Sequence, residues 1–146
     1  MAPSRGPGYD LGVASSHLSG RVVLIVDDDP VLLELLAGAF ADVGSTVHTA
    51  RLLVQAQREV AEHRPDLVIT DVNLADGTAI EFITWLRSLS VVQGRRTPCV
   101  AITGHPSFHA PAAAAGFQAA LRKPVDLREV CNVANAVLSR SSSSSD

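Results

Sequence analysis

The clearest signal of the fold class is the stretch Val22-Val23-Leu24-Ile25-Val26, which is followed directly by Asp27-Asp28-Asp29-Pro30. Five apolar, mostly β-branched residues in a row are typical of a short strand that is buried on both faces. Pro30 suits the first turn of a helix, and Asp29 suits the N-cap position before it. The stretch therefore predicts a buried strand that leads directly into a helix.

The same strand-then-helix pattern recurs along the rest of the chain. Further strands are expected at 46–50, 66–71, 98–103 and 117–121, and helices at 30–43, 52–63, 78–89, 108–115 and 126–138. A loop is expected at 73–77. Alternating units of this kind predict a doubly wound α/β fold, with a five-stranded parallel sheet and helices on both faces.

The two ends of the chain differ in composition from this middle part. Residues 1–20 are rich in Gly, Pro and Ser, and residues 139–146 contain a run of five serines. Both patterns are typical of flexible or disordered tails. Residues 21–138 are then a single domain, and neither tail has the size or pattern of an output domain.

Composition argues against several classes of function. The formal net charge is −3, so the chain lacks the basic field that direct binding to DNA or RNA requires. No apolar run approaches the roughly 18 residues of a membrane span, and the first residues lack the pattern of a secretory signal. These observations predict a cytoplasmic protein. Cys99 and Cys131 are expected to be buried, reduced thiols, and His48, His63 and His109 are interpreted as surface residues without metal-ligand partners.

Polar residues follow four of the predicted strands. Asp27–Asp29 come after the first strand, Asp71 ends the third, Thr103 ends the fourth, and Lys123 follows the fifth. Ligands of open α/β sheets bind beyond the carboxyl ends of the strands, so these side chains are expected to share one cleft. Clustered carboxylates repel one another unless a hard cation such as Mg²⁺ is bound between them. An ionised Asp can attack phosphorus, and a hydroxyl and an ammonium can hold phosphoryl oxygens.

Lys123 is the only lysine in the chain. Lys and Arg together number 12, so the other 11 basic residues are arginines. A solvated surface cation could be either residue, whereas the compact ammonium and the planar guanidinium are not interchangeable at a binding site. We therefore interpret Lys123 as required by its chemistry.

Four motifs resemble, in order and spacing, the receiver domain of two-component response regulators. They are VDDDP at 26–30, TDVNLADG at 70–77, AITG at 101–104 and RKPVD at 122–126. The resemblance covers residues 21–138 and implies a flavodoxin-like sheet in the order 2-1-3-4-5.

The resemblance also implies a role for each site residue. Asp71 is the expected phosphoacceptor, and Thr103 and Lys123 are expected to hold the phosphoryl group. The metal ligands expected for Mg²⁺ are Asp27, Asp28, Asp71 and the backbone carbonyl of Asn73. Asn73 and His105 are expected to tune hydrolysis of the aspartyl phosphate.

The implied partners are a sensor histidine kinase or a histidine phosphotransfer protein, and an unidentified downstream protein. The expected module is not an enzyme; it switches or relays a phosphoryl signal without an output domain of its own. Two positions depart from the family pattern. Ala75 stands where a Pro is usual, and Ala120 stands where an aromatic switch residue is usual, so the standard coupled motion of that ring with Thr103 cannot occur.

Two other functions fit parts of the sequence. Asp27-Asp28-Asp29-Pro30-Val31 also matches the D-x-D-x-V pattern of haloacid-dehalogenase-like phosphatases, in which Asp27 would be the nucleophile and Asp29 the general acid. The short chain, the lack of an acidic pair after Lys123 and the unexplained Asp71 argue against that activity. The second alternative is a pseudo-receiver that binds partners without phosphorylation. The alanine at position 120 keeps this alternative open, whereas the intact acidic pair and the presence of Asp71, Thr103 and Lys123 argue against it.

Overall fold

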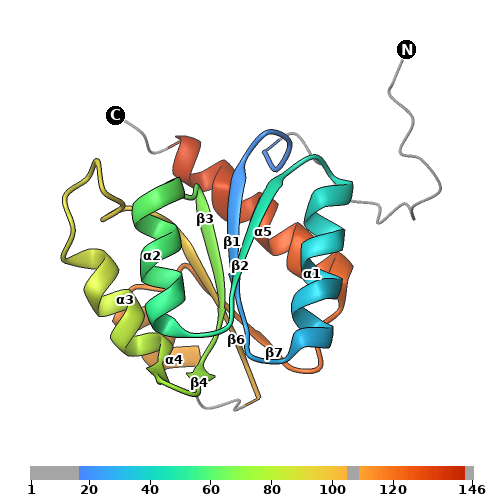
Figure 1. The fold of residues 1–146 in the computed structure, drawn as a ribbon. Coiled ribbons are helices and arrows are strands. Elements are labelled where there is room, and N and C mark those ends of the chain that lie inside the picture. Colours follow the sequence, from blue (N-terminus) through green and yellow to red (C-terminus); the bar gives the residue numbers. More distant parts are fainter. Residues whose placement is uncertain (1–16, 105–108, 144–146) are drawn as a thin grey trace.

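The structure, a computed structural model, describes residues 17–104 and 109–143. Its centre is a five-stranded parallel sheet in the order β2-β1-β3-β6-β7 (Figure 1). The strands are β1 (Val22–Val26), β2 (Thr46–Ala50), β3 (Leu67–Asp71), β6 (Cys99–Thr103) and β7 (Ala119–Arg122). Counted along the chain, these five strands have the order 2-1-3-4-5, which confirms the predicted fold class.

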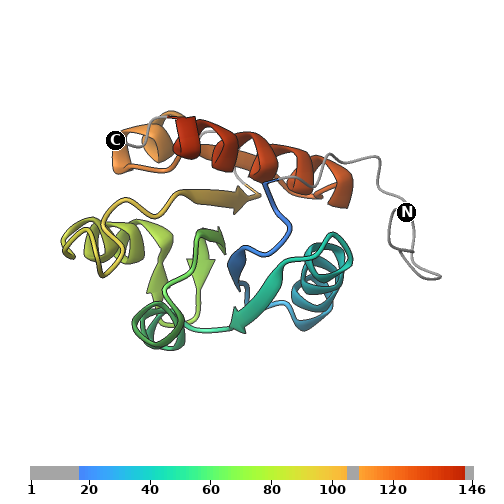
Figure 2. The ribbon, with the colours of Figure 1, turned by 90° about the horizontal axis from the view of Figure 1, so that it is seen from above.

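Helices cover both faces of the sheet. They are α1 (Pro30–Asp42), α2 (Leu53–His63), α3 (Ala79–Arg87), α4 (His109–Ala115) and α5 (Leu127–Ser143). The helices α1 and α5 pack on one face, and α2, α3 and α4 pack on the other (Figures 1 and 2). Among the described residues, no helix combines the length and apolar character that crossing a bilayer requires.

The apolar strands supply two cores, one on each face. In β1, Val23 and Ile25 belong to the core beneath α1 and α5, whereas Leu24 and Val26 belong to the core beneath α2 and α3. Successive side chains of a strand point to opposite faces, so a strand covered on both sides needs an uninterrupted apolar run. This requirement explains why the first stretch of sequence predicts its strand correctly.

The register brings the carboxyl ends of the strands to one edge. Val26 pairs with Thr70 of β3, Asp71 pairs with Ile102 of β6, and Thr103 pairs with Arg122 of β7. The polar residues at these strand ends therefore meet at the edge where an α/β sheet binds ligands.

The predicted loop at 73–77 contains a small antiparallel hairpin, formed by β4 (Asn73–Leu74) and β5 (Gly77–Thr78). Asp76 lies in the turn of this hairpin. It accepts hydrogen bonds from the backbone N–H groups of Leu53 at 2.8 Å and Val54 at 3.1 Å. It therefore caps α2, whose own N-cap residue makes no side-chain hydrogen bond. Gly77 has a φ of +149° and would direct a Cβ into Leu53 and Glu81, so the turn requires glycine.

Both ends of the described domain extend beyond the predicted boundaries at 21 and 138. Leu18 is fully buried in the core beneath α1 and α5, and its carbonyl accepts a hydrogen bond from Ser45 Oγ at 2.8 Å. At the other end, α5 continues to Ser143. An isolated apolar residue and a serine-rich helix end carry weak periodic signals, so the sequence pattern places these boundaries poorly.

Candidate functional site

Three acidic side chains meet at the carboxyl edge of the sheet. Asp27 and Asp28 follow β1, Asp71 ends β3, and one oxygen of each lies within 4.8 Å of the others. Asp27 and Asp71 are buried, with 1% and 9% of their surface exposed, whereas Asp28 is exposed. The fold thus assembles the acidic cluster from segments that are far apart in sequence.

Lys123 adds an ammonium to this cluster. Its Nζ lies 3.2 Å from Asp71 Oδ2, across 52 residues of sequence, and 3.6 Å from Asp27 Oδ2. The lone lysine of the chain is therefore the cation that faces the two buried carboxylates. A flexible stem and a compact charge suit this position between two strand ends.

Hydrogen bonds fix how the two buried carboxylates lie. Asp71 Oδ1 accepts a hydrogen bond from the N–H of Val72 at 2.8 Å, which leaves Oδ2 toward Lys123. Asp27 Oδ1 accepts one from the N–H of Asp29 at 2.9 Å. Asp27 Oδ2 is buried and has no hydrogen-bond partner among the described residues, although it faces the Lys123 ammonium.

The donor set of this cluster suits Mg²⁺. A buried carboxylate oxygen without a hydrogen bond is costly unless another group satisfies it. Hard divalent cations prefer oxygen ligands, and Mg²⁺ commonly uses one or two carboxylates with water and phosphate. The unsatisfied oxygen of Asp27 and the adjacent oxygens of Asp28 and Asp71 therefore fit such an ion.

The electrostatics of the cluster lead to the same inference. Burial raises the pKa of Asp27, and the neighbouring carboxylates of Asp71 and Asp28 raise it further, whereas the Asp29 N–H and Lys123 oppose the rise. Burial alone would lower the pKa of Lys123, but the carboxylates of Asp71 and Asp27 outweigh it and raise that pKa. The cluster thus holds three carboxyl groups and one ammonium, which pairs with two of them, so a further positive charge would be favourable there.

Thr103 lies at the end of β6 and is 1% exposed. Its carbonyl oxygen accepts a hydrogen bond from the N–H of Lys123 at 2.8 Å, which places the two residues on adjoining strand ends. Asn73 is exposed in β4, two residues beyond Asp71. His105 lies outside the described residues, and the roles predicted for these three residues remain predictions.

The surroundings of the acidic cluster include one residue that the sequence patterns did not single out. Arg51, directly after β2, donates from Nη2 to the backbone carbonyl of Asp28 at 3.2 Å. Arg51, Asp28 and Ala75 line a common hollow beside the acidic cluster. A single arginine in a loop carries no motif, so only the packing of β2 beside β1 reveals this contact.

Ala120 lies in β7 opposite Ala101 of β6 and packs against the core beneath α3 and α4. It is partly buried. A methyl group therefore occupies the position where the family pattern has a ring, and any movement coupled to Thr103 must use other groups.

Comparisons with known proteins agree with this fold. The sequence pattern of the response regulator receiver domain matches residues 23–135. The chain is 41% identical over 70 residues to the KDP operon transcriptional regulatory protein KdpE of Escherichia coli (strain K12), covering 48% of this chain and 31% of KdpE. It is 31% identical over 112 residues to response regulator protein PilR of Pseudomonas aeruginosa, covering 75% of this chain and 24% of PilR.

A solved structure has the same fold. The CheY-like response regulator receiver domain protein from Methanospirillum hungatei JF-1 superposes with a TM-score of 0.78 at 21% identity, covering 87% of this chain and 100% of that one. The chain belongs to the response regulator receiver domain family. This family consists of signalling domains of two-component systems. The chain spans less than a third of the length of KdpE and PilR.

Proposed function

We propose that Asp71 accepts a phosphoryl group from the phosphohistidine of a sensor histidine kinase or a histidine phosphotransfer protein. The observation that carries this proposal is the position of the Asp71 carboxylate. It is buried at a strand end, 3.2 Å from the only lysine and beside two further carboxyl groups. A carboxylate oriented by a backbone N–H and facing a cation is a competent nucleophile toward phosphorus.

The proposed transfer forms one bond and breaks one bond. A carboxylate oxygen of Asp71 forms a bond to phosphorus, and the bond between phosphorus and the donor's imidazole nitrogen breaks. The leaving nitrogen keeps the electron pair, and the product on Asp71 is an acyl phosphate. Lys123 pairs with one phosphoryl oxygen and the Thr103 hydroxyl donates to another, which stabilises the added charge.

The ligands proposed for Mg²⁺ are Asp27, Asp28, Asp71 and the backbone carbonyl of Asn73. When bound, this ion supplies positive charge that offsets the phosphoryl oxygens during transfer. The unsatisfied Oδ2 of Asp27 supports the proposal, because that oxygen is buried without a hydrogen bond.

Intact-mass measurement tests the proposal directly. Incubation with acetyl phosphate and Mg²⁺ should add one phosphoryl group, which hydroxylamine should remove because it cleaves acyl phosphates. Asp71→Asn should abolish the addition. Asp76→Asn is the matched control, since Asp76 lies in the same loop but its carboxylate caps α2. An unchanged mass of the wild-type protein would refute the assignment and favour the pseudo-receiver. Equal labelling of Asp71→Asn would refute it by showing that another residue accepts the phosphoryl group.

The phosphatase alternative receives less support from the geometry. Asp29, its supposed general acid, is the N-cap of α1 and accepts a hydrogen bond from the N–H of Val31 at 3.0 Å. Sustained turnover of a generic phosphomonoester that is lost in Asp27→Asn would nevertheless establish that activity. A receiver should show no such turnover.

We further propose that the signal passes from this domain to a partner protein in the cytoplasm and not directly to nucleic acid. The net charge of −3 supports this, because it provides no general attraction to phosphates. The surface proposed to change comprises β6, α4 and β7, next to the proposed phosphoryl site. A pull-down with beryllofluoride and Mg²⁺, compared with Asp71→Asn, would identify a partner that depends on the phosphorylated form.

A further inference from the structure

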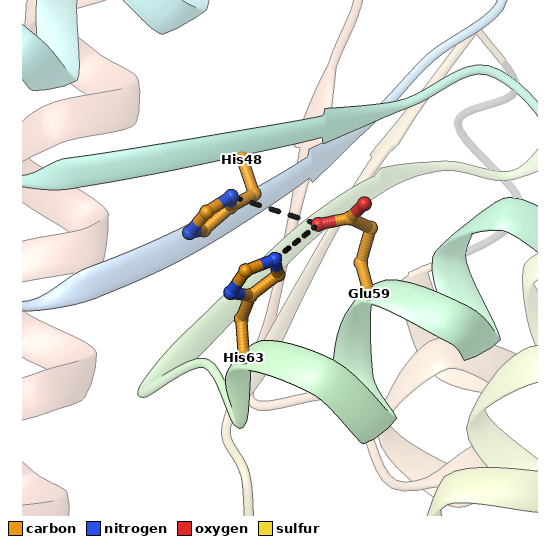
Figure 3. Close-up of side chains that lie close together, drawn as sticks. All are labelled: His48, Glu59 and His63. Carbon is orange, nitrogen blue, oxygen red and sulfur yellow. Dashed lines mark ion pairs between the residues drawn. The ribbon is translucent and has the colours of Figure 1, made fainter.

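A second cluster of ligand-type side chains lies away from the acidic cluster, between β2 and α2. It consists of His48, Glu59 and His63, and one ligand atom of each lies within 4.8 Å of the others (Figure 3). The interpretation of His48 and His63 as residues without metal-ligand partners is therefore wrong. The separation of His48 and His63 in the sequence gives no sign of their contact, which forms only when β2 and α2 pack together.

The fold explains why these three side chains meet. His48 lies on the face of β2 that also carries Ala50, and Ala50 packs in the core formed with α2. Glu59 and His63 are four residues apart on α2, so their side chains lie one above the other on a single helix face. Figure 3 shows both of them directed toward His48.

The distances within the cluster suit a shared ion better than direct hydrogen bonds. Glu59 Oε1 lies 3.6 Å from His48 Nδ1 and 3.6 Å from His63 Nε2. A hydrogen bond between such atoms is shorter. Two ligands of one tetrahedral Zn²⁺ ion, in contrast, lie roughly 3.4 Å apart.

The Glu59 oxygen at the centre of the cluster is unsatisfied. Glu59 Oε1 is buried and has no hydrogen-bond partner among the described residues. The side chains of His48, Glu59 and His63 are 27%, 25% and 40% exposed, so the cluster as a whole is open to solvent. A hollow that is lined by Thr49, Gln55 and Glu59, and also by Arg51 and Arg58, borders Glu59 beside the edge strand β2.

We propose that His48, Glu59 and His63 bind a Zn²⁺ ion through Nδ1, Oε1 and Nε2, with water completing the coordination. Two imidazoles and one carboxylate are a donor set that zinc uses, and nitrogen ligands distinguish this site from the all-oxygen acidic cluster. The rings are stacked with centroids 3.8 Å apart and planes 14° apart. Binding would therefore require the rings to turn out of this stacked arrangement, so that each ligand nitrogen directs its lone pair at the ion.

The test is a Zn²⁺ titration of untagged protein by isothermal titration calorimetry, with Mg²⁺ in excess to occupy the acidic cluster. Wild-type protein should bind one Zn²⁺ per chain. His48→Gln, Glu59→Gln and His63→Gln should each weaken binding at least about tenfold. Two controls should leave it unchanged: His17→Gln, whose backbone N–H contacts Asn135 of α5, and Asp71→Asn, which alters the acidic cluster.

A second measurement does not depend on variants. In wild-type protein, the imidazole NMR signals of His48 and His63 should shift on addition of Zn²⁺, whereas that of His17 should not. Equal affinity of wild type and His63→Gln, unshifted His48 and His63 signals, or zinc binding that disappears in Asp71→Asn would each overturn the proposal. The last result would assign the ion to the acidic cluster.

Discussion

The N–H of Lys123 donates a 2.8 Å hydrogen bond to the carbonyl oxygen of Thr103, where β6 and β7 end side by side. The two residues proposed to hold the phosphoryl group are therefore connected through the main chain as well as through their shared position. Displacement of Thr103 toward a new anion would also act on the loop that carries the lysine. This connection offers a route for the response that does not need an aromatic ring at position 120.

Lys123→Ala tests the contribution of the ammonium to the cluster. Without Mg²⁺, we expect the free energy of unfolding to fall by about 1 kcal/mol, because Asp27 and Asp71 lose the cation between them; partial exposure limits the loss. Urea denaturation with and without Mg²⁺ measures this. The difference from wild type should shrink as the pH rises through the raised pKa of Lys123, above its ordinary 10.5. Identical midpoints at neutral pH without Mg²⁺ would contradict the expectation.

Asp27→Asn should stabilise the protein when no Mg²⁺ is present, by about 1 kcal/mol at neutral pH. The substitution removes a buried charge, and its remaining oxygen can still accept the hydrogen bond from Asp29. Because the folded state raises the pKa of Asp27 above 3.8, ionisation costs wild-type stability as the pH rises through that higher value.

Thermal denaturation across this pH range measures the effect, with and without Mg²⁺. The advantage of Asp27→Asn should vanish below about pH 4, where the wild-type carboxyl is protonated. Added Mg²⁺ should raise the Tm of wild type more than that of the variant. An advantage of the same size at every pH would show that charge is not its cause.

Asp76→Ala should lower the Tm while leaving Asp71 competent to accept a phosphoryl group. The backbone N–H of Leu53 holds the pKa of Asp76 below its usual value, and the N–H of Val54 adds to this. The stabilisation is therefore present above pH 3.8 and is lost as the pH falls through the lower folded value. Thermal denaturation measures the expected loss of stability, and intact-mass labelling checks that Asp71 still accepts a phosphoryl group. An unchanged Tm of the variant at neutral pH would show that Asp76 does not stabilise α2 as its cap.

The two thiols should resist alkylation in the native protein. Both are free and buried, and burial raises the pKa of Cys99 to about 12 and that of Cys131 to about 11. Iodoacetamide at neutral pH should leave the native mass unchanged and should add two groups once the chain is unfolded in urea. Rapid native labelling at either cysteine would show that its region opens.

Sequence patterns predict the sheet well and the contacts between its loops and helices poorly. The apolar run at Val22–Val26 predicts a strand with the observed bounds, because burial on both faces admits few other residues. The cap that Asp76 provides to α2 gives no local signal, since acceptor and donors are more than 20 residues apart.

The zinc ligands proposed here were missed for a similar reason. Glu59 and His63 form a recognisable pair on one helix, but the third ligand comes from a strand. His48 reaches them only because β2 turns that face toward α2. Residue spacing alone cannot reveal a site completed by tertiary packing.

Helix α2 connects the hairpin after Asp71 with the proposed zinc site beside β2. Asp76 of the hairpin caps the first turn of α2, and His63 is the last residue of the same helix. A phosphoryl group that pulled the hairpin would shift this helix relative to its neighbouring strand. By thermodynamic linkage, the effect would be mutual. If phosphorylation changed the free energy of zinc binding, bound zinc would change the free energy of phosphorylation by the same amount.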